Sequence, residues 1–153
     1  MISKSELVQG IRFAGERAAA AATHCKDWDH QLGHQWTTGD AFRHVAGTSG
    51  GAAGLYPRLD SGALSGLGVG QIAEGNARTI TKLNEMSKDQ VIQAIRDGHN
   101  ASADFIATVD DADLAKVVTL GGYEMPKAEI VAQIWIHHAI AHSYEASARW
   151  PIQ

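Results

Sequence analysis

The sequence has few of the features that mark secreted or membrane-spanning proteins. It has a single cysteine, Cys25, so no disulfide can form within the chain. This favours a reducing compartment and leaves packing or a metal to hold the fold. The longest apolar run, Ala18–Ala22, is far shorter than the ~20 residues that cross a bilayer, and the first residues do not follow the basic-then-apolar pattern of a signal peptide. We therefore expect a cytoplasmic protein with no membrane partner.

Positive charge, proline and strand-like patterns are also scarce. Thirteen Lys and Arg against seventeen Asp and Glu give a net charge of -4, so the surface is unsuited to phosphates and no nucleic-acid partner is expected. Three prolines among 153 residues, with 44% apolar and 20% charged residues, fit one compact domain over residues 1–153. Alternation of apolar and polar residues is nearly absent, which favours an all-α fold.

Helical periodicity and capping residues divide the chain into five helical segments. Ser3 with Glu6, and Ser87 with Gln90, form capping boxes, and Thr37 or Thr38 can cap a helix that Pro57 ends. The predicted helices cover about 3–23, 37–56, 71–86, 88–109 and 126–149. Residues 60–70 form a long Gly-rich connection, and residues 116–123 are predicted to be a short extended arm or hairpin.

Eight histidines are the unusual feature of the composition. His138 and His142 are four residues apart on the last predicted helix, so their imidazoles leave one face about 5–6 Å apart at Cβ and can reach one metal ion. They lie on the side that the apolar period directs inward, where an imidazole needs a partner. A shared cation would satisfy both, and the alternative is a pair of core histidines bonded to backbone or water.

Other histidines are candidates for completing the site. His44 lies on the apolar stripe of the second predicted helix and is the best-placed third ligand. His99, on the inward edge of the fourth, is a rival, or else a core-edge histidine bonded to a neighbouring carbonyl. His30 and His34 share the spacing of four but belong to a loop, where we expect exposed residues. His137 points about 100° away from His138 and is expected at the surface or behind the ligands.

The run from Trp36 to Gly47, WTTGDAFRHVAG, resembles the tryptophan-led second-helix motif of the DinB-like superfamily, which includes the metal-binding domain of mycothiol-dependent maleylpyruvate isomerase. In that motif the residue matching His44 is a metal ligand, and His138-x-x-x-His142 resembles the family's C-terminal pair. The resemblance implies a four-helix bundle with a long crossover connection, a divalent metal held by His44, His138 and His142, and often a homodimer. The isomerase branch typically has a carboxylate where this chain has His138, which favours the broader thiol-transferase branch.

Three neutral imidazoles suit a divalent transition ion, for which we expect Zn²⁺, with Ni²⁺, Fe²⁺ and Co²⁺ also suited. Three protein ligands leave a coordination position open, as in catalytic zinc sites. The first hypothesis is therefore a metal-dependent thiol S-transferase, or a related isomerase or hydrolase, whose partners are a small-molecule thiol and an electrophilic substrate. Two alternatives stay open: a non-catalytic metal-binding or stress-related interaction protein, and a helical domain without a metal.

Four further side chains are candidates for supporting roles. Glu145, Tyr144 and Asn76 could orient the imidazoles or position a ligand, and Arg149 could meet a substrate carboxylate. Each is also explained as an ordinary group on a helix surface, with Arg149 complementing the helix dipole.

Overall fold

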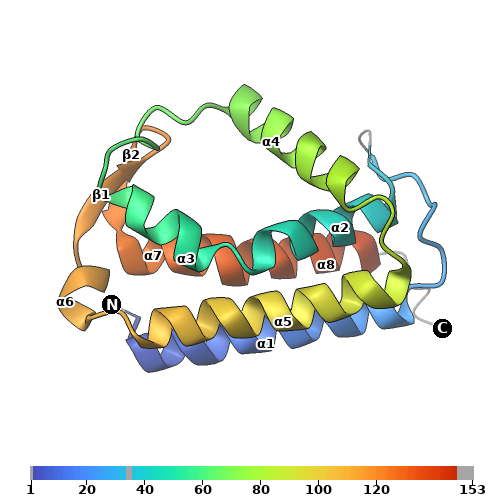
Figure 1. The fold of residues 1–153 in the computed structure, drawn as a ribbon, viewed down its shortest axis with the longest axis horizontal. Helices are drawn as coiled ribbons and strands as arrows, with labels where there is room; N and C mark the ends of the chain where they lie inside the picture. The colour runs from blue at the N-terminus through green and yellow to red at the C-terminus, as the bar shows by residue number, and fades with distance from the viewer. Residues whose placement is uncertain (1, 34–35, 148–153) are drawn as a thin grey trace.

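The computed structural model describes residues 2–33 and 36–147 and is mostly helical, as the sequence predicts. Helices α1 (Lys4–His24) and α5 (Lys88–Ala107) lie side by side in one layer (Figure 1). The other layer contains α2 (Thr38–Ser49) and α8 (His138–Ser147), which cross the first layer on one face. Within the described ranges, no helix is both long and apolar enough to cross a membrane.

The predicted capping residues set the starts of three of these helices. Ser3 with Glu6 caps α1, Thr37 with Asp40 caps α2, and Ser87 with Gln90 caps α5, each pair forming a reciprocal capping box. The side chain accepts a bond from an otherwise unpaired N–H of the first turn, which stabilises that end of the helix. The starts of these elements were therefore predictable to within a residue.

The prediction of one long second helix is wrong. Helix α2 ends at Ser49, and a short α3 (Ala52–Leu55) and a 3₁₀ turn η1 (Tyr56–Leu59) follow it. The break lies where α5 comes closest: a Cβ on Gly98 would be 2.8 Å from the backbone N of Gly50. Ser102 Oγ donates to the carbonyl of Ser49 at 2.5 Å and accepts from the N–H of Ala52 at 3.4 Å. The serine thus satisfies backbone groups that the interrupted helix leaves unpaired.

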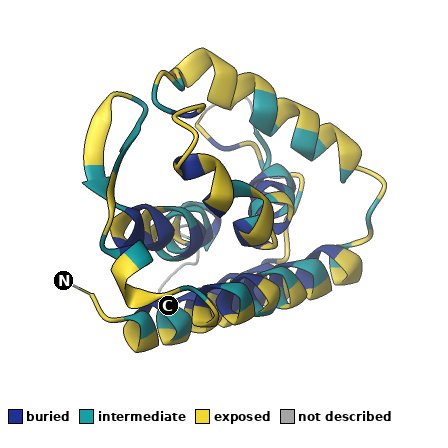
Figure 2. Ribbon diagram, turned by 60° about the vertical axis from the view of Figure 1, so that its left-hand side comes forward, coloured by how far each residue is buried: buried dark blue, intermediate teal, exposed yellow. Residues whose placement is uncertain are grey.

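Helix α4 (Val69–Lys82) begins and ends earlier than predicted and packs on the rest of the fold at only one end. Its C-terminal part contacts α2, where Thr79 lies against Gly47 and Arg43 Nε donates to the carbonyl of Leu83 at 3.2 Å. None of its residues is buried, and Ile72 on its apolar stripe is 45% exposed. Figure 2 shows α4 as a mostly exposed helix that stands away from the layers.

The predicted arm is a two-stranded hairpin. Strand β1 (Val117–Leu120) pairs antiparallel with β2 (Tyr123–Pro126), with Leu120 opposite Tyr123. The turn residues Gly121 and Gly122 have φ of 57° and 85°, the left-handed conformations that such a two-residue turn requires. A short helix α6 (Asp111–Leu114), which the sequence did not predict, precedes the hairpin.

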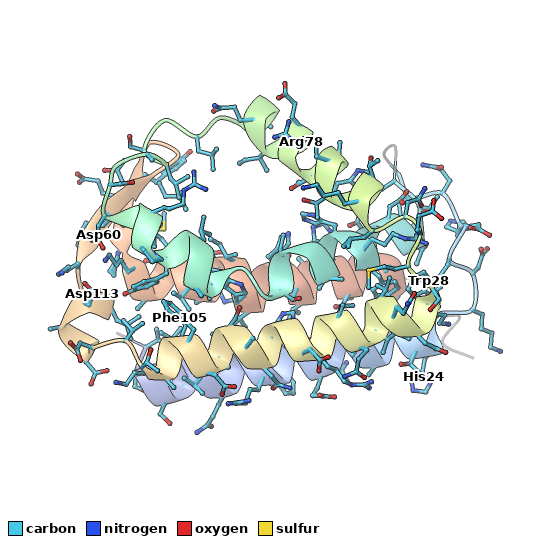
Figure 3. All side chains as sticks on the ribbon, viewed as in Figure 1. His24, Trp28, Asp60, Arg78, Phe105 and Asp113 are labelled. Atoms are coloured by element: carbon cyan, nitrogen blue, oxygen red, sulfur yellow. The ribbon has the colours of Figure 1, made fainter. Side chains whose placement is uncertain are left out.

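A buried lysine joins the elements at the hairpin end of the molecule. Lys127, fully buried at the start of α7 (Lys127–Ala132), pairs with Asp60 at 2.6 Å and with Asp113 at 3.2 Å. The hydroxyl of Tyr56 donates to Asp113 at 2.8 Å. Hydrogen bonds from Lys116, Tyr56 and Lys127, in that order, hold the pKa of Asp113 far below its ordinary value. Figure 3 shows Asp60 and Asp113 at this end and Trp28 at the opposite one. Lys127 is buried whereas the two carboxylates are partly exposed, so removal of both carboxylates would leave a buried charge unpaired, which is destabilising. The cluster thus ties Asp60 and α6 to the start of α7.

The last helix is not a continuous α-helix. It runs from α7 through a π-helical turn η2 (Gln133–His137) into α8, and Pro126 is its N-cap, one residue outside the predicted start. Trp135, in the π turn, is buried and donates its indole N–H to the carbonyl of Thr48 at 3.2 Å. This bond ties the last helix to the end of α2.

Two apolar clusters fill the space between the layers. One surrounds Trp135 and Leu7 near the hairpin end, and the other surrounds Phe42 and Ile95 at the end where α2 begins. The three predicted metal-binding histidines belong to α2 and α8, which border the second cluster. The core thus holds the two helices that carry them at a defined distance.

Candidate metal centre

His44, His138 and His142 meet in one place. Nε2 of His44 is 2.7 Å from Nε2 of His138, and the three ring centroids are 4.7 to 4.9 Å apart. The rings are nearly perpendicular to one another, and each offers a ligand atom within 4.8 Å of the other two. His44 is 3% exposed, whereas the other two are partly exposed. The cluster therefore has a closed side and a side that solvent can reach.

Local structure explains why these side chains converge. The N–H groups of Thr38 and Gly39 donate to the carbonyls of His30 and Trp28, which fixes the loop before α2 and the start of the helix. One turn after His44, the carbonyl of Thr48 accepts the bond from Trp135, and His138 follows Trp135 by three residues. Residues three or four apart share a helix face, so this bond places His44 opposite His138. His142 follows on the same face one turn later.

The surroundings keep the imidazoles of His44 and His138 neutral. Burial, followed by the proximity of His138 and His142, lowers the pKa of His44 to about 3. Burial likewise lowers the pKa of His138 to about 4, with smaller effects from His142 and His99. Metal ligation needs the deprotonated ring with a free lone pair. At neutral pH both rings are in that form.

The geometry fits a shared cation better than an ordinary core arrangement. In a tetrahedral zinc site, nitrogens bound at 2.0–2.1 Å from the ion lie about 3.3 Å from one another. The donor atoms here, 2.7 Å apart for the closest pair and within 4.8 Å overall, lie on either side of that value. Nδ1 of His44 is buried and has no hydrogen-bond partner among the described residues. A cation bound at Nε2 would leave this nitrogen unpaired, so the support for a shared cation comes from the spacing of the donor atoms of the three rings.

Trp36 forms one wall of the cluster. Its ring centroid is 4.9 Å from that of His44 and 5.7 Å from that of His142. Sequence reasoning singled out this tryptophan only as the first residue of the motif and assigned it no contact. Its position just before the N-cap Thr37 was the available signal, because that position folds back along the first turns of the helix.

A family model described as the DinB superfamily matches residues 16–146, which include all three histidines and Trp36. The chain belongs to the DinB superfamily. The resemblance seen in the second-helix motif is thereby confirmed, together with the all-α fold that it implies. No curated protein and no solved structure gave a match in the other two comparisons.

Among the described residues of this DinB-family protein, the group of three close histidines does not include His30, His99 or His137. His99 is a core histidine: it is 2% exposed, and its Nδ1 is 2.8 Å from the carbonyl of Ile95. His137 is exposed and bonds to Gln133 at 3.3 Å. His30 is half-buried rather than exposed and lies 3.9 Å from Asp27, whereas His34 falls outside the described residues. Of the histidines that the structure describes, His44, His138 and His142 thus form a group of their own.

The four candidates for supporting roles lie at different places relative to the histidine cluster. Glu145 contacts the cluster, with Oε2 3.0 Å from Nδ1 of His142. Tyr144 is 74% exposed, and Asn76 is half-buried on α4, outside the group of three histidines. Arg149 lies outside the described residues. Glu145 is the one member of this set that the structure joins to the imidazoles.

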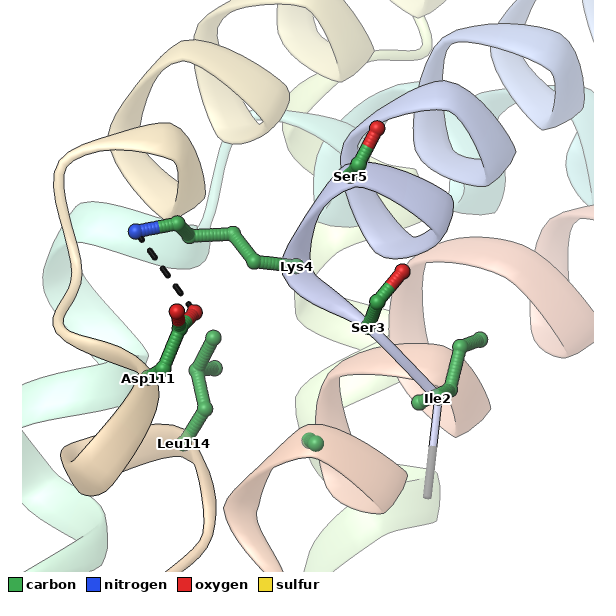
Figure 4. Close-up of a pocket in the computed structure, with 7 residues that line it drawn as sticks. Ile2, Ser3, Lys4, Ser5, Asp111 and Leu114 are labelled. Atoms are coloured by element: carbon green, nitrogen blue, oxygen red, sulfur yellow. Dashed lines mark ion pairs between the residues drawn. The ribbon is translucent and has the colours of Figure 1, made fainter.

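A hollow of about 480 Å³ lies at the start of α1. Figure 4 shows Lys4 reaching toward Asp111, with which it pairs at 3.6 Å. Its lining consists of Ile2, Ser3, Lys4, Ser5, Asp111, Leu114 and Ala128. No histidine or cysteine is among these residues, so the chemistry points to the three-histidine cluster instead.

Proposed function

We propose that this DinB-family protein binds one divalent transition ion through His44, His138 and His142 and acts as a metal-dependent thiol S-transferase, or a related isomerase or hydrolase. Zn²⁺ is the ion we expect, and Ni²⁺ or Fe²⁺ suits the same ligands. The proposal rests on the convergence of three imidazoles from α2 and the last helix, although His44 and His138 are 94 residues apart in the sequence. The proposed setting is the cytoplasm and the proposed assembly a homodimer, as in the family the chain resembles.

The chemistry follows from the composition of the ligand set. Three protein ligands leave at least one coordination position for an exogenous group. When bound, such an ion supplies Lewis acidity, which lowers the pKa of a thiol or a water so that it is a nucleophile near neutral pH. The proposed substrates are therefore a low-molecular-weight thiol and a small electrophile.

The protein's own residues define the site around that position. His44 anchors the closed side, and the Trp36 indole covers the side shared by His44 and His142. An apolar wall excludes water and strengthens the electrostatic interactions beside it. A substrate is expected to approach from the partly exposed side of His138 and His142.

A second candidate is a non-catalytic metal-binding or stress-related interaction protein. In the described part of the chain, the group of possible ligands contains histidines alone, with no carboxylate or cysteine as a member. The carboxylate that contacts the cluster, Glu145, is bonded to His142. A general acid or base would therefore have to be this bonded carboxylate or a group of the substrate. This observation keeps a binding role in view beside the enzymatic one.

Conjugation assays separate the two candidates. Zinc-loaded protein is incubated with glutathione, bacillithiol or mycothiol and an aromatic halide electrophile, and thioether formation is followed by absorbance. We expect a rate above that of free Zn²⁺, at least tenfold lower in His44→Ala, and within twofold of wild type in the control His137→Ala, which removes an exposed histidine of the last helix. No turnover above free metal with any thiol would contradict the enzymatic proposal and favour the binding role.

A further inference from the structure

Glu145 holds one of the three proposed ligands from behind. Its carboxylate Oε2 is 3.0 Å from Nδ1 of His142, and the two residues are three apart on α8. Both side chains are partly buried, with 20% of His142 and 34% of Glu145 exposed. A carboxylate accepts hydrogen bonds and does not donate them when ionised, so the imidazole must donate. The proton of His142 is therefore on Nδ1.

This hydrogen bond decides which nitrogen of His142 is free for a ligand role. With the proton on Nδ1, the lone pair of a neutral ring is on Nε2. Nε2 is the nitrogen through which His44 and His138 already face each other. Without Glu145 both tautomers of His142 would be accessible, and part of the population would offer the wrong nitrogen.

The carboxylate of Glu145 gives His142 a partner of a kind that the other two rings do not have among the described residues. Nδ1 of His44 is buried without a hydrogen-bond partner among the described residues, and His138 is joined to His44 rather than to a carboxylate. Among the hydrogen bonds of the described residues, the bond from His142 to Glu145 is the one that links the cluster to a carboxylate. It therefore places a carboxylate behind one ligand, where its charge can offset that of a cation and its oxygen can orient the ring.

We propose that Glu145 is a positioning residue for the metal centre, which orients His142 and fixes its Nδ1–H tautomer so that Nε2 faces the shared ion. The inference rests on the proposed metal binding and goes beyond it, because it assigns a role to a residue outside the ligand set. An ordinary exposed i, i+3 ion pair would instead stabilise the helix only slightly and would not change the metal affinity.

Metal affinity in three variants tests the proposal. Zn²⁺ dissociation constants are measured by competition with a chromophoric chelator for wild type, Glu145→Ala, Glu145→Gln and Glu129→Ala. The last variant is the matched control, since Glu129 is an exposed carboxylate in the first turn of α7. We expect Glu145→Ala to bind Zn²⁺ about 10 to 100 times more weakly. Glu145→Gln, which keeps an acceptor oxygen and loses the charge, should lie between Glu145→Ala and wild type, and Glu129→Ala within twofold of wild type.

A spectroscopic readout separates positioning from helix stability. In ¹⁵N–¹H correlation spectra of the zinc-loaded protein, His142 should be protonated at Nδ1 and ligated at Nε2. Ligation through Nδ1, or an affinity of Glu145→Ala no weaker than that of Glu129→Ala, would overturn the proposal while leaving metal binding intact. Wild-type protein that binds no Zn²⁺ at all would instead overturn the proposed function and this inference with it.

Discussion

At the scale of single residues, His44 and His138 combine two properties that oppose each other in water. They are close enough for their ring nitrogens to be 2.7 Å apart, and they are neutral because burial disfavours the charged ring. Two charged imidazoles at that distance would repel each other. Burial and the nearby ring therefore both favour the neutral form of each ring.

This neutrality predicts a pH dependence of stability. In the folded metal-free protein the pKa values of His44 and His138 are about 3 and about 4, whereas in the unfolded chain both are near the ordinary 6.5. Between these values the unfolded state binds more protons. The contribution of the two neutral rings to the free energy of unfolding is therefore complete above pH 6.5. It falls as the pH is lowered, by up to about 1.4 kcal/mol per pH unit for each ring.

Urea unfolding in the presence of a chelator, at pH 7.5, 6.5 and 5.5, measures this dependence. Burial also lowers the pKa of His99, which adds to the slope in the same direction. In the double variant His44→Asn/His138→Asn, the free energy of unfolding should depend less on pH, because only His99 and other groups still contribute to the slope. A free energy of unfolding that does not change between pH 6.5 and 5.5 would show that the two rings are not held neutral.

At the scale of secondary-structure elements, the sequence predicted best where a local signal decides the structure. Capping boxes at Ser3 and Ser87 located the starts of α1 and α5, and Gly121–Gly122 marked the hairpin turn. The end of α2 was not predictable, because it depends on the approach of Gly98 and on bonds from Ser102, both on a distant helix. Tertiary contacts overrode the helical period there.

For the candidate site too, local sequence signals were predictive and tertiary contacts were not predictable. Helical spacing was enough to pair His138 with His142 and to place His44 on an inward face. The π turn at Gln133–His137 has no sequence signature in a single chain, and neither does the bond from Trp135 to Thr48 that aligns the two helices. Contacts such as that of Trp36 with His44 required the structure, since they join a loop to a helix face.

Close approach of α1 and α5 gives a prediction at this scale. A Cβ on Gly15 would lie 2.5 Å from Cβ of His99, so alanine there must push the helices apart, at a cost of about 1–3 kcal/mol. Gly75, on α4, has nothing within 4 Å of the corresponding point. Because both positions are helical, Gly75→Ala should instead stabilise by up to about 1 kcal/mol.

Thermal unfolding of the two variants compares crowding with helix propensity directly. Gly15→Ala should unfold at a lower temperature than wild type, and Gly75→Ala at the same or a higher one. Equal shifts for the two variants would mean that α1 and α5 are not packed as closely as described.

At the scale of the whole molecule, metal binding and folding stability are coupled. An ion that binds the folded state alone, present at 100 times its dissociation constant, adds about 2.7 kcal/mol to the free energy of unfolding. For a domain of this size that raises Tm by roughly 5–10 °C. Wild-type protein should therefore melt at a lower temperature after treatment with EDTA.

The variant His142→Ala provides the control for this prediction. It removes one proposed ligand, so its Tm should respond little to either zinc or EDTA. The control His137→Ala should respond like wild type, since His137 lies outside the cluster. An unchanged Tm of wild type on addition and removal of zinc would count against tight binding by the folded protein.

The central claim is that three imidazoles from α2 and α8 hold one transition ion. Crystals of protein purified without an affinity tag, measured on both sides of the iron, nickel and zinc absorption edges, test it most directly. The account predicts one anomalous peak per chain, about 2.0–2.1 Å from ring nitrogens of His44, His138 and His142. Anomalous maps with no peak among these rings, or with the rings turned away from one another, would contradict it.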